Sequence, residues 1–368
     1  MARAAWDQAE NVLCARLDTL GDVLMATPAI RALVETNPAR RITLLTSPAG
    51  AEVARLVPEI DDVIVYDAPW MKATTLRSDS GPEYAMLERL YQCHFDAAVI
   101  FTVYSQNPLP SAMLCYLADI PLRLAYCHEN PYQLLTDWIP DPEPAEFIRH
   151  EVQRQLDLVG MIDCYANDPR LSLCPTQGAK YRVQQMLEEL GVDGRAPWLV
   201  MHTGATAPSR RYPGERFAEA AQQLTEAHGF QVVFTGVEAE EPYIGRIRHA
   251  MDARSFSLVG RLNLDEMAAL LAETPLLISN NTGPVHMAAA VGTPVVDLYA
   301  LTNPQHTPWQ VAHRVLFHDV PCKYCYKSIC PEGHHDCLRR VAPAQIVAAA
   351  CELLGRAPVS LSATPGQP

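Results

Sequence analysis

Three short segments of the 368-residue chain hold side chains suited to proton transfer or anion binding. The first segment, Arg16-Leu-Asp-Thr-Leu-Gly-Asp-Val-Leu24, places Asp22 at the turn between a buried strand and a helix. A carboxylate there can take a proton from a hydroxyl group if it faces a cleft. The competing interpretation is that Asp22 only caps the helix, which is the commoner role of an aspartate in that place. No Gly-x-Gly-x-x-Gly follows the strand, so dinucleotide binding lacks its main support.

The second segment, Ser279-Asn-Asn-Thr-Gly-Pro-Val-His286, follows a predicted strand and opens a helix. Thr282 or Gly283 can cap this helix, and Gly292 is suited to end it. Unpaired backbone N–H groups at a helix N-terminus bind phosphate, and His286 in the first turn could donate to the same anion. An ordinary capped helix explains the local pattern about equally well.

The third segment runs from His202 to Pro213 and contains two adjacent arginines, Arg210 and Arg211. Their guanidinium groups could neutralise the charge that builds on a departing diphosphate. Thr203, in the same segment, is a further candidate for binding that group. The alternative is a solvated loop with two surface arginines.

The elements that must position these segments alternate between strands and helices. Such alternation predicts parallel sheets with helices on both faces, and open parallel sheets bind ligands at the carboxyl ends of their strands. We therefore predict an α/β fold of two doubly wound, Rossmann-like domains that face a cleft. The predicted strands are 12–17, 41–46, 62–66, 95–101, 198–202, 231–235, 255–259, 276–279 and 294–299, and helices are predicted from about 22 and at 48–56, 83–93, 108–119, 147–161 and 343–354.

The alternation stops in a proline-rich stretch at 128–146 and restarts after a linker near 160–178. This gives an N-terminal domain at 1–165 and a C-terminal domain at 166–340, which includes a cysteine-rich loop at 322–337. A C-terminal helix is expected at 341–356, followed by a disordered tail at 357–368 that is rich in Pro, Ser and Gly.

Composition narrows the class of protein. Hydrophobic residues make up 49% of the chain and charged residues 19%, as expected for a folded globular protein. The net charge of −13 argues against general nucleic-acid binding. No apolar run approaches the roughly 20 residues that cross a bilayer, and Met1–Glu10 lacks the apolar core of a signal peptide. We therefore expect a cytoplasmic protein whose 11 cysteines are free thiols by default.

Taken together, these segments resemble glycosyltransferase family 9, which includes the ADP-heptose:lipopolysaccharide heptosyltransferases. The stretch Ser209-Arg-Arg-Tyr-Pro-Gly-Glu-Arg-Phe217 stands where the family usually has Lys-Arg-Trp-Pro. Further matching pieces are Leu258-Val-Gly-Arg-Leu-Asn-Leu-Asp-Glu266 and Cys337-Leu-Arg-Arg340, before the last helix. The resemblance runs in the same order over about residues 12–354.

The resemblance implies a GT-B fold, with the acceptor on the N-terminal domain and the nucleotide-sugar on the C-terminal domain. It also implies single-displacement transfer with inversion at the anomeric carbon, with no metal ion and no cofactor. Asp22 matches the family's catalytic base. Thr282, Gly283 and His286 match its diphosphate-binding turn, and Arg210 falls where a phosphate-contacting lysine is usual.

Two further positions concern the donor. Glu238 or Glu241 is expected near the nucleotide ribose. Asn281 stands where the family commonly has an aspartate that would hold hydroxyl groups of the donor sugar. Because an asparagine can both donate and accept hydrogen bonds, this departure leaves open whether the donor sugar is the usual heptose or a related hexose.

The resemblance therefore predicts transfer from a nucleoside-diphosphate donor, ADP-heptose first, to lipopolysaccharide core or another cell-surface glycan. The acceptor would be met at the inner-membrane face, where peripheral contact with the membrane is expected. Two alternatives stay open: a nucleotide-sugar epimerase of the same fold, and a catalytically silent protein that binds a sugar nucleotide.

A cluster of four cysteines near the C-terminus suggests a different chemistry. Cys322, Cys325, Cys330 and Cys337 lie within 16 residues, beside two histidines, and four thiolates can bind zinc tetrahedrally. The spacing does not match a standard pair of Cys-x-x-Cys knuckles. A structural or redox-labile loop is therefore favoured over a zinc or iron–sulfur centre, and neither interpretation gives these cysteines a catalytic role.

Overall fold

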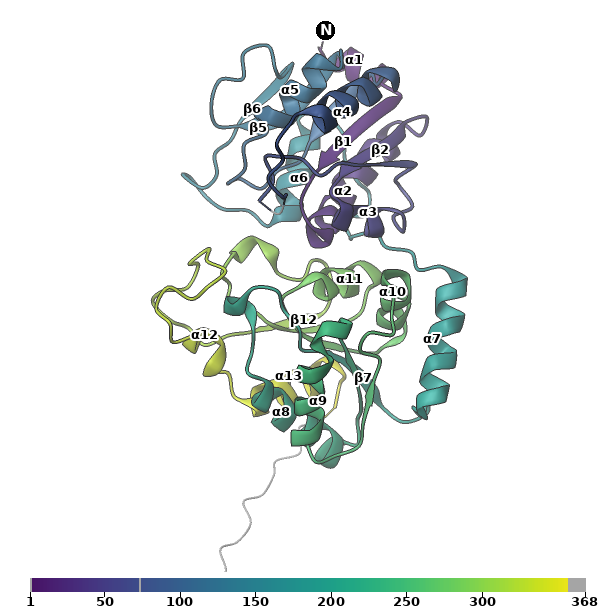
Figure 1. Cartoon of the computed structure of the whole chain (residues 1–368), viewed down its shortest axis with the longest axis vertical. Coiled ribbons are helices and arrows are strands. Elements are labelled where there is room, and N and C mark those ends of the chain that lie inside the picture. Colours follow the sequence, from purple (N-terminus) through teal and green to yellow (C-terminus); the bar gives the residue numbers. More distant parts are fainter. Residues whose placement is uncertain (1, 73, 357–368) are drawn as a thin grey trace, which may run out of the picture. The chain divides into compact units, whose positions relative to one another are not determined.

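The computed structural model describes residues 2–72 and 74–356, and the chain forms two compact units. The first unit ends at Cys174 and the second begins at Pro175. Each unit has its own parallel sheet and its own helices, coloured purple to teal in the first unit and teal to yellow in the second (Figure 1). The predicted tail at 357–368 lies outside the described residues.

The first unit is a doubly wound sheet of six parallel strands in the order β3-β2-β1-β4-β5-β6. The order reverses between β1 and β4, which makes the carboxyl ends of these two strands the expected ligand-binding edge. The elements are α1 Ala2–Gln8, β1 Asn11–Arg16, α2 Leu20–Thr36, β2 Arg41–Thr46, α3 Pro48–Ala54, β3 Asp62–Val65, α4 Gly81–Gln92, β4 Ala97–Ile100, α5 Leu109–Leu117, β5 Leu122–Cys127, β6 Asp137–Pro140 and α6 Glu151–Gly160.

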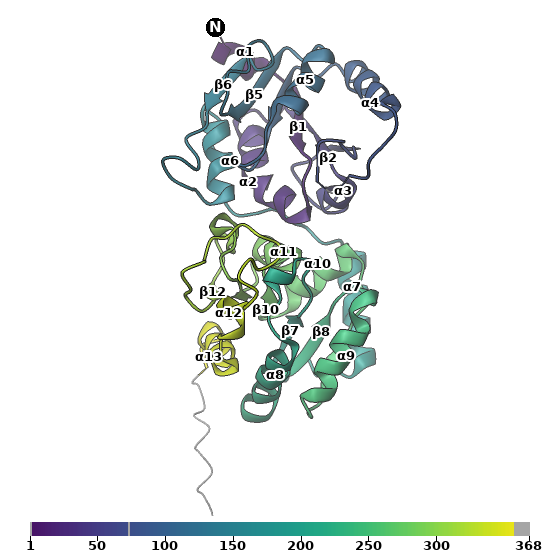
Figure 2. The same ribbon diagram turned by 60° about the vertical axis from the view of Figure 1, so that its left-hand side comes forward.

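Apolar side chains bury both faces of this sheet. Leu13 and Ala15 on β1 pack in one cluster with Leu90 on α4 and Cys115 on α5, so these two helices cover one face. Helix α2 packs against α3 and α6, and these three helices form the other layer, as Figure 2 shows. Since the strands are covered on both sides, only the loops at their ends reach ligands.

The second unit repeats the arrangement, with six parallel strands in the order β12-β11-β10-β7-β8-β9. Its order reverses between β7 and β10. The elements are α7 Gln177–Leu190, β7 Trp198–His202, η1 Pro208–Arg210, α8 Gly214–His228, β8 Gln231–Thr235, η2 Glu238–Glu240, α9 Glu241–Ala250, β9 Ser255–Ser257, α10 Leu264–Glu273, β10 Leu277–Asn280, α11 Gly283–Val291, β11 Val295–Leu298, η3 Pro304–His306, β12 His313–Leu316, α12 Asp336–Arg339 and α13 Pro343–Leu353.

The core of the second unit explains why α13 belongs to it and does not stand apart as a separate C-terminal element. Ile346 and Ala350 of α13 are buried in the same cluster as Phe217 of α8 and Leu298 of β11. Helices α8, α9 and α13 therefore cover one face of this sheet. Helices α10, α11 and α7 pack together in the other layer, where Figure 1 shows α7 in teal.

The predicted architecture of two doubly wound parallel sheets is confirmed, and every predicted strand is present with ends shifted by no more than two residues. The prediction omitted three strands, β5, β6 and β12. Two of these lie at sheet edges: β6 is four residues long and ends at Pro140, and β12 is also four residues long. Edge strands pair on one side only, so they tolerate proline and carry a weak hydrophobic pattern.

The units divide after Cys174, whereas the sequence placed the boundary after residue 165. The reason is that residues 166–174 pack back onto the first unit. Arg31 on α2 donates to the carbonyls of Asp168 and Arg170 at 2.6 and 2.7 Å, and the Cys174 N–H donates to Leu56 O at 2.8 Å. A turn-rich composition indicates a loop but does not show which core holds it.

We predict that Arg31→Met destabilises the first unit by about 2 kcal/mol, because it removes the donor to two carbonyls and the cation that faces the partly buried Glu59. The melting temperature should fall by about 4–8 °C in a calorimetric scan. The exposed Arg55 provides the control, since Arg55→Met should change the melting temperature little. Equal melting temperatures of the Arg31→Met and Arg55→Met variants would contradict this role of Arg31.

Candidate functional site

Asp22 lies in the first turn of α2, at the carboxyl end of β1. Its Oδ2 accepts hydrogen bonds from the Thr19 N–H at 3.1 Å and the Thr19 hydroxyl at 2.7 Å, as in a capping box. Its Oδ1 accepts from Arg16 Nη2 at 3.1 Å. Asp22 therefore does contribute to the helix cap, but the cap engages one oxygen and the other oxygen faces a cation.

Arg16 is fully buried and faces three carboxylates. Its guanidinium nitrogens lie 3.0 Å from Asp18, 3.1 Å from Asp22 and 2.9 Å from Glu151. These carboxylates raise the pKa of Arg16 above its ordinary value despite its burial. Burial raises the pKa of both Glu151 and Asp18, while Arg16 opposes that shift. The result is one cation shared by three acids next to the candidate base.

A large cavity opens beside this cluster in the first unit. Its volume is about 1020 Å³, and it is bordered by loops that follow β1, β2, β3 and β4. Asp18 and Thr19 line it on one side, and Tyr66, Trp70 and Phe101 are among its apolar residues. A pocket that combines aromatic walls with a few polar groups is suited to a sugar-containing ligand.

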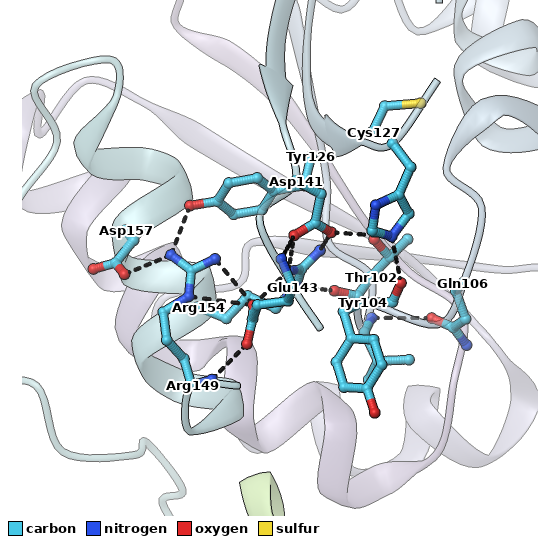
Figure 3. Close-up of polar contacts among 12 residues, drawn as sticks. Thr102, Tyr104, Gln106, Tyr126, Cys127, Asp141, Glu143, Arg149, Arg154 and Asp157 are labelled. Carbon is cyan, nitrogen blue, oxygen red and sulfur yellow. Dashed lines mark hydrogen bonds and ion pairs between the residues drawn. The ribbon is translucent and has the colours of Figure 1, made fainter. Parts of the chain in front are cut away.

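The loop after β4, residues 102–107, lines this cavity and is fixed by side chains from three other segments. Arg154 on α6 donates to Thr102 O at 2.9 Å, and His128 after β5 contacts Tyr104 O at 2.9 Å (Figure 3). The Gln106 amide donates to the Asp18 carboxylate. The loop is therefore joined directly to the Arg16 cluster.

Arg154 is held in turn by a buried ionic network, drawn in Figure 3. It lies 2.6 Å from both Asp141 and Glu143, and its guanidinium stacks over the Tyr126 ring at 4.5 Å. Arg149 also binds Glu143, at 3.0 Å. Because each charge has a partner, this network can hold the cavity loop rigidly without leaving an isolated buried ion.

In the second unit, Asn280 connects the two loops that the sequence singled out. This fully buried residue ends β10 and donates to Thr203 O at 2.8 Å, while its Oδ1 accepts from the Tyr212 N–H at 3.0 Å. The loop after β7 is thereby tied to the start of α11. The Thr203 hydroxyl is buried and has no hydrogen-bond partner in the described part of the chain, as expected for a group that binds a ligand.

The start of α11 has the form expected of an anion-binding turn. Thr282 is extended and directs its hydroxyl to Asn280 O at 3.3 Å, and it does not cap the helix with its side chain. Gly283 is the first helical residue, and the buried His286 lies in the first turn. The helix dipole therefore favours negative charge at this N-terminus.

The two arginines of the third segment point to different places. Arg210 stacks on Tyr299, with 5.8 Å from its guanidinium carbon to the ring centroid, and its charge acts on Asp297 of β11. Arg211 is exposed and donates to Ala205 O at 2.7 Å. Arg210 therefore reaches the carboxyl end of β11, whereas Arg211 lines a separate surface pocket with α8 and α9.

Glu240, and not Glu238 or Glu241, reaches the carboxyl ends of β7 and β8. A Cβ added to Gly204 would collide with the Glu240 carboxylate, and one added to Gly236 would lie 2.8 Å from Glu240 Oε2. The Glu240 carboxylate therefore lies close to the backbone of both glycines. Glu238 instead lies against Gly260, after β9.

The amide nitrogen of Asn281 is engaged by interior groups, whereas its buried Oδ1 has no hydrogen-bond partner among the described residues. Its amide donates to Asp297 Oδ2 at 2.9 Å and to His306 O at 3.0 Å, and its side chain is fully buried. The contact with donor-sugar hydroxyls stays a prediction, and Oδ1 is the atom that is available for it. Burial raises the pKa of Asp297 to about 8, against the opposing effects of Asn281 and Arg210.

Comparison with known proteins decides the family. Residues 84–335 match the family model described as glycosyltransferase family 9 (heptosyltransferase). This chain belongs to glycosyltransferase family 9. It is therefore a glycosyltransferase, and the resemblance in its motifs is confirmed.

Individual relatives of this family 9 member cover most of its length. It is 27% identical to lipooligosaccharide heptosyltransferase 2 of Haemophilus influenzae, over 81% of this chain and 85% of that one. It is 24% identical to lipopolysaccharide heptosyltransferase 2 of Escherichia coli, over 89% and 94%. The structure of Escherichia coli ADP-heptose lps heptosyltransferase II superposes with a TM-score of 0.72 at 23% identity, covering 94% of this chain and 98% of that one.

Within this glycosyltransferase, the structure brings some of the predicted residues together and separates others. Asn280 joins the loop that carries Thr203 to the start of α11, where Thr282, Gly283 and His286 lie, and Arg210 lies near the end of β11. Sequence reasoning missed Glu151 and Glu240. Glu240 could have been weighed with its acidic neighbours, but Glu151 carries no local signal because its partner is 135 positions away.

The cysteine loop contacts the turn that carries Arg210. Cys322, Cys325, Cys330 and Cys337 all border one small cavity of about 20 Å³. Across the residues described, no group of three or more His, Cys, Asp or Glu side chains is arranged to hold a metal ion. The loop instead binds Ser209, whose N–H and hydroxyl donate to Ser328 O at 3.0 Å and Lys327 O at 2.7 Å. It therefore fixes the turn that carries Arg210.

No helix of residues 2–72 or 74–356 has the length and apolar character needed to cross a membrane.

We predict that Asp297 makes the enzyme less stable as pH rises from about 4 to about 8. Its folded pKa, about 8, is above the unfolded value of 3.8, so the native state keeps a proton that the unfolded chain has lost. Asp297→Asn should remove this part of the pH dependence. Urea unfolding at pH 5 and pH 7.5 should show a smaller loss of stability for the variant than for the wild type. An equal loss in both proteins would contradict the assignment.

Proposed function

We propose that this chain is an inverting, metal-independent heptosyltransferase that transfers a heptose from an ADP-linked donor to the lipopolysaccharide core. The observation that carries the proposal is the placement of Asp22. Its carboxylate is held by Arg16 and by Thr19, and Thr19 lines the large cavity of the first unit. The names of the relatives, which are heptosyltransferases, support the choice of sugar and acceptor.

The reaction assigned to this site is a single displacement. Asp22 takes the proton from an acceptor hydroxyl as that oxygen forms a bond to the anomeric carbon of the donor. The bond between the anomeric carbon and the diphosphate oxygen breaks, and its electron pair leaves with the nucleoside diphosphate. Because one bond forms opposite the bond that breaks, the configuration at the anomeric carbon inverts.

The second unit supplies positive potential for the leaving group. The N–H groups at the start of α11 and the guanidinium of Arg210 stabilise charge that develops on the diphosphate. The Thr203 hydroxyl, buried without a partner in the described structure, is a further donor for the phosphate oxygens. Glu240 takes the role predicted from the sequence for Glu238 or Glu241, as acceptor of hydrogen bonds from the ribose hydroxyls.

The acceptor chemistry also implies where the enzyme works. Lipopolysaccharide core is attached to a membrane lipid, so the acceptor is met at the cytoplasmic face of the inner membrane. The aromatic cavity of the first unit is the candidate acceptor site.

We predict that Asp22→Asn lowers kcat about 10²–10⁴-fold and leaves the affinity for ADP unchanged. The reason is that an amide cannot accept the hydroxyl proton, while the nucleotide binds the other unit. Transfer should be measured with ADP-heptose and a heptose-accepting core oligosaccharide, with and without EDTA. Full activity in EDTA is expected, because protein groups supply the positive charge.

Each rival makes a different prediction in the same assay. Turnover of the donor without acceptor would favour an epimerase. Nucleotide binding with no turnover in the wild type would favour a silent binding protein. Loss of transfer in EDTA, restored by a divalent ion, would overturn the metal-independent mechanism.

We predict that Glu240→Gln weakens ADP binding about tenfold or more, since a hydrogen bond to a charged group contributes about 1.5–3 kcal/mol. Glu238→Gln is the matched control and should change the dissociation constant less than about twofold. Calorimetric titration with ADP measures both variants. If Glu238→Gln has the larger effect, the ribose assignment returns to Glu238.

A further inference from the structure

Glu151 lies outside every segment that matched the family motifs, yet it contacts the same cation as Asp22. It is the first residue of α6, and its side chain is buried with an exposed fraction of 1%. Its Oε1 accepts from Arg16 Nη1 at 2.9 Å, while Arg16 Nη2 donates to Asp22 at 3.1 Å. One guanidinium therefore separates the two carboxylates.

We propose that Glu151 sets the proton affinity of Asp22 through Arg16, as a positioning residue for deprotonation of the acceptor. This inference rests on the proposed role of Asp22 as the base. In the reaction the charge of Asp22 changes from −1 to 0. With Asp18, Asp22 and Glu151 all facing Arg16, three negative charges compete for one positive charge until Asp22 takes the proton.

This competition makes Asp22 a stronger base. A guanidinium alone would favour the ionised carboxylate and weaken its hold on a proton. A second carboxylate on the same guanidinium opposes that effect, because like charges repel and one of them is relieved by protonation. The site lies next to a large cavity and is mostly buried, so water screens the repulsion weakly.

Glu151 is held so that it cannot turn away from Arg16. The Gln155 amide, one turn along α6, donates to Glu151 Oε1 at 2.7 Å and to Thr102 O at 3.1 Å. Helix α6 also packs against α2, which carries Asp22. The same bonds link Glu151 to the loop after β4 that borders the cavity. Gln155 therefore holds both the Glu151 carboxylate and this loop.

The other charged groups around Glu151 do not replace Arg16. Arg154 is its cationic neighbour on α6, but its guanidinium binds Asp141 and Glu143, each at 2.6 Å. His150 precedes Glu151, and its Nδ1 accepts from the Val152 N–H at 3.2 Å, as a nitrogen without a proton does. Asp18, after β1, and Asp22 also face Arg16.

The test is the pH profile of kcat/KM for transfer by the full-length Glu151→Gln variant. Replacing the carboxylate with an amide of the same shape should lower the proton affinity of Asp22. The acid limb should therefore move to lower pH by about one unit, and the plateau rate should fall several-fold because the base is weaker. The matched control is Glu146→Gln, on the exposed stretch before α6, which should reproduce the wild-type profile.

ADP affinity and thermal melting distinguish tuning from misfolding. A folded Glu151→Gln variant that binds ADP normally and has an unshifted acid limb would overturn the inference. If that variant does not fold, Glu151→Asp serves instead, since it keeps the charge but withdraws it from Arg16. The acid limb of its pH profile should also shift to lower pH, and an unchanged acid limb would again overturn the inference.

Failure of the proposed function has a separate signature. If Asp22→Asn keeps wild-type activity, Asp22 is not the base, whatever the profile of Glu151→Gln. If Asp22→Asn loses activity and Glu151→Gln keeps the wild-type pH profile, the role of Asp22 as the base is supported and only the proposed role of Glu151 is overturned.

Discussion

The burial of one guanidinium, that of Arg16, is the constraint on which the first unit depends. A fully buried arginine requires carboxylate partners, and here it draws them from the loop after β1, from α2 and from the start of α6. Helix α2 carries the candidate base, the loop after β1 forms a wall of the cavity, and α6 fixes the loop after β4. Removing the cation would leave three acids facing each other, so the geometry and the charge of the site have a common origin.

In the second unit the corresponding task falls to a buried amide, which joins the two loops that carry the candidate donor-binding residues. Asn280 does this by bonding the loops after β7 and β10 together, so that Thr203 and the start of α11 stay in register. Ser209, bound by the cysteine loop, fixes Arg210 from the other side. The cysteine loop therefore contributes to the position of Arg210 through the Lys327 and Ser328 carbonyls.

The sequence was most informative where function and local structure coincide. Asp22, Thr282 and Gly283 lie at strand-to-helix turns. The position of such a turn can be predicted from the residues next to it in the sequence. Glu151 could not be predicted because its meaning depends on a partner 135 positions away. The sequence offered Glu238 or Glu241 and missed Glu240, because spacing alone does not show which side of this helical turn faces Gly204. The same holds for Arg210 and Arg211, which are adjacent in sequence and point to different pockets.

Asn281 shows how a departure from a family motif can have a cause unrelated to substrate. An aspartate at this position would lie beside Asp297, which is buried and already holds its proton up to about pH 8. Two carboxylates in contact in such a place cannot both ionise. An asparagine removes the conflict and donates to both Asp297 and the His306 carbonyl. The contacts inside the second unit therefore give a structural reason for an asparagine at this position.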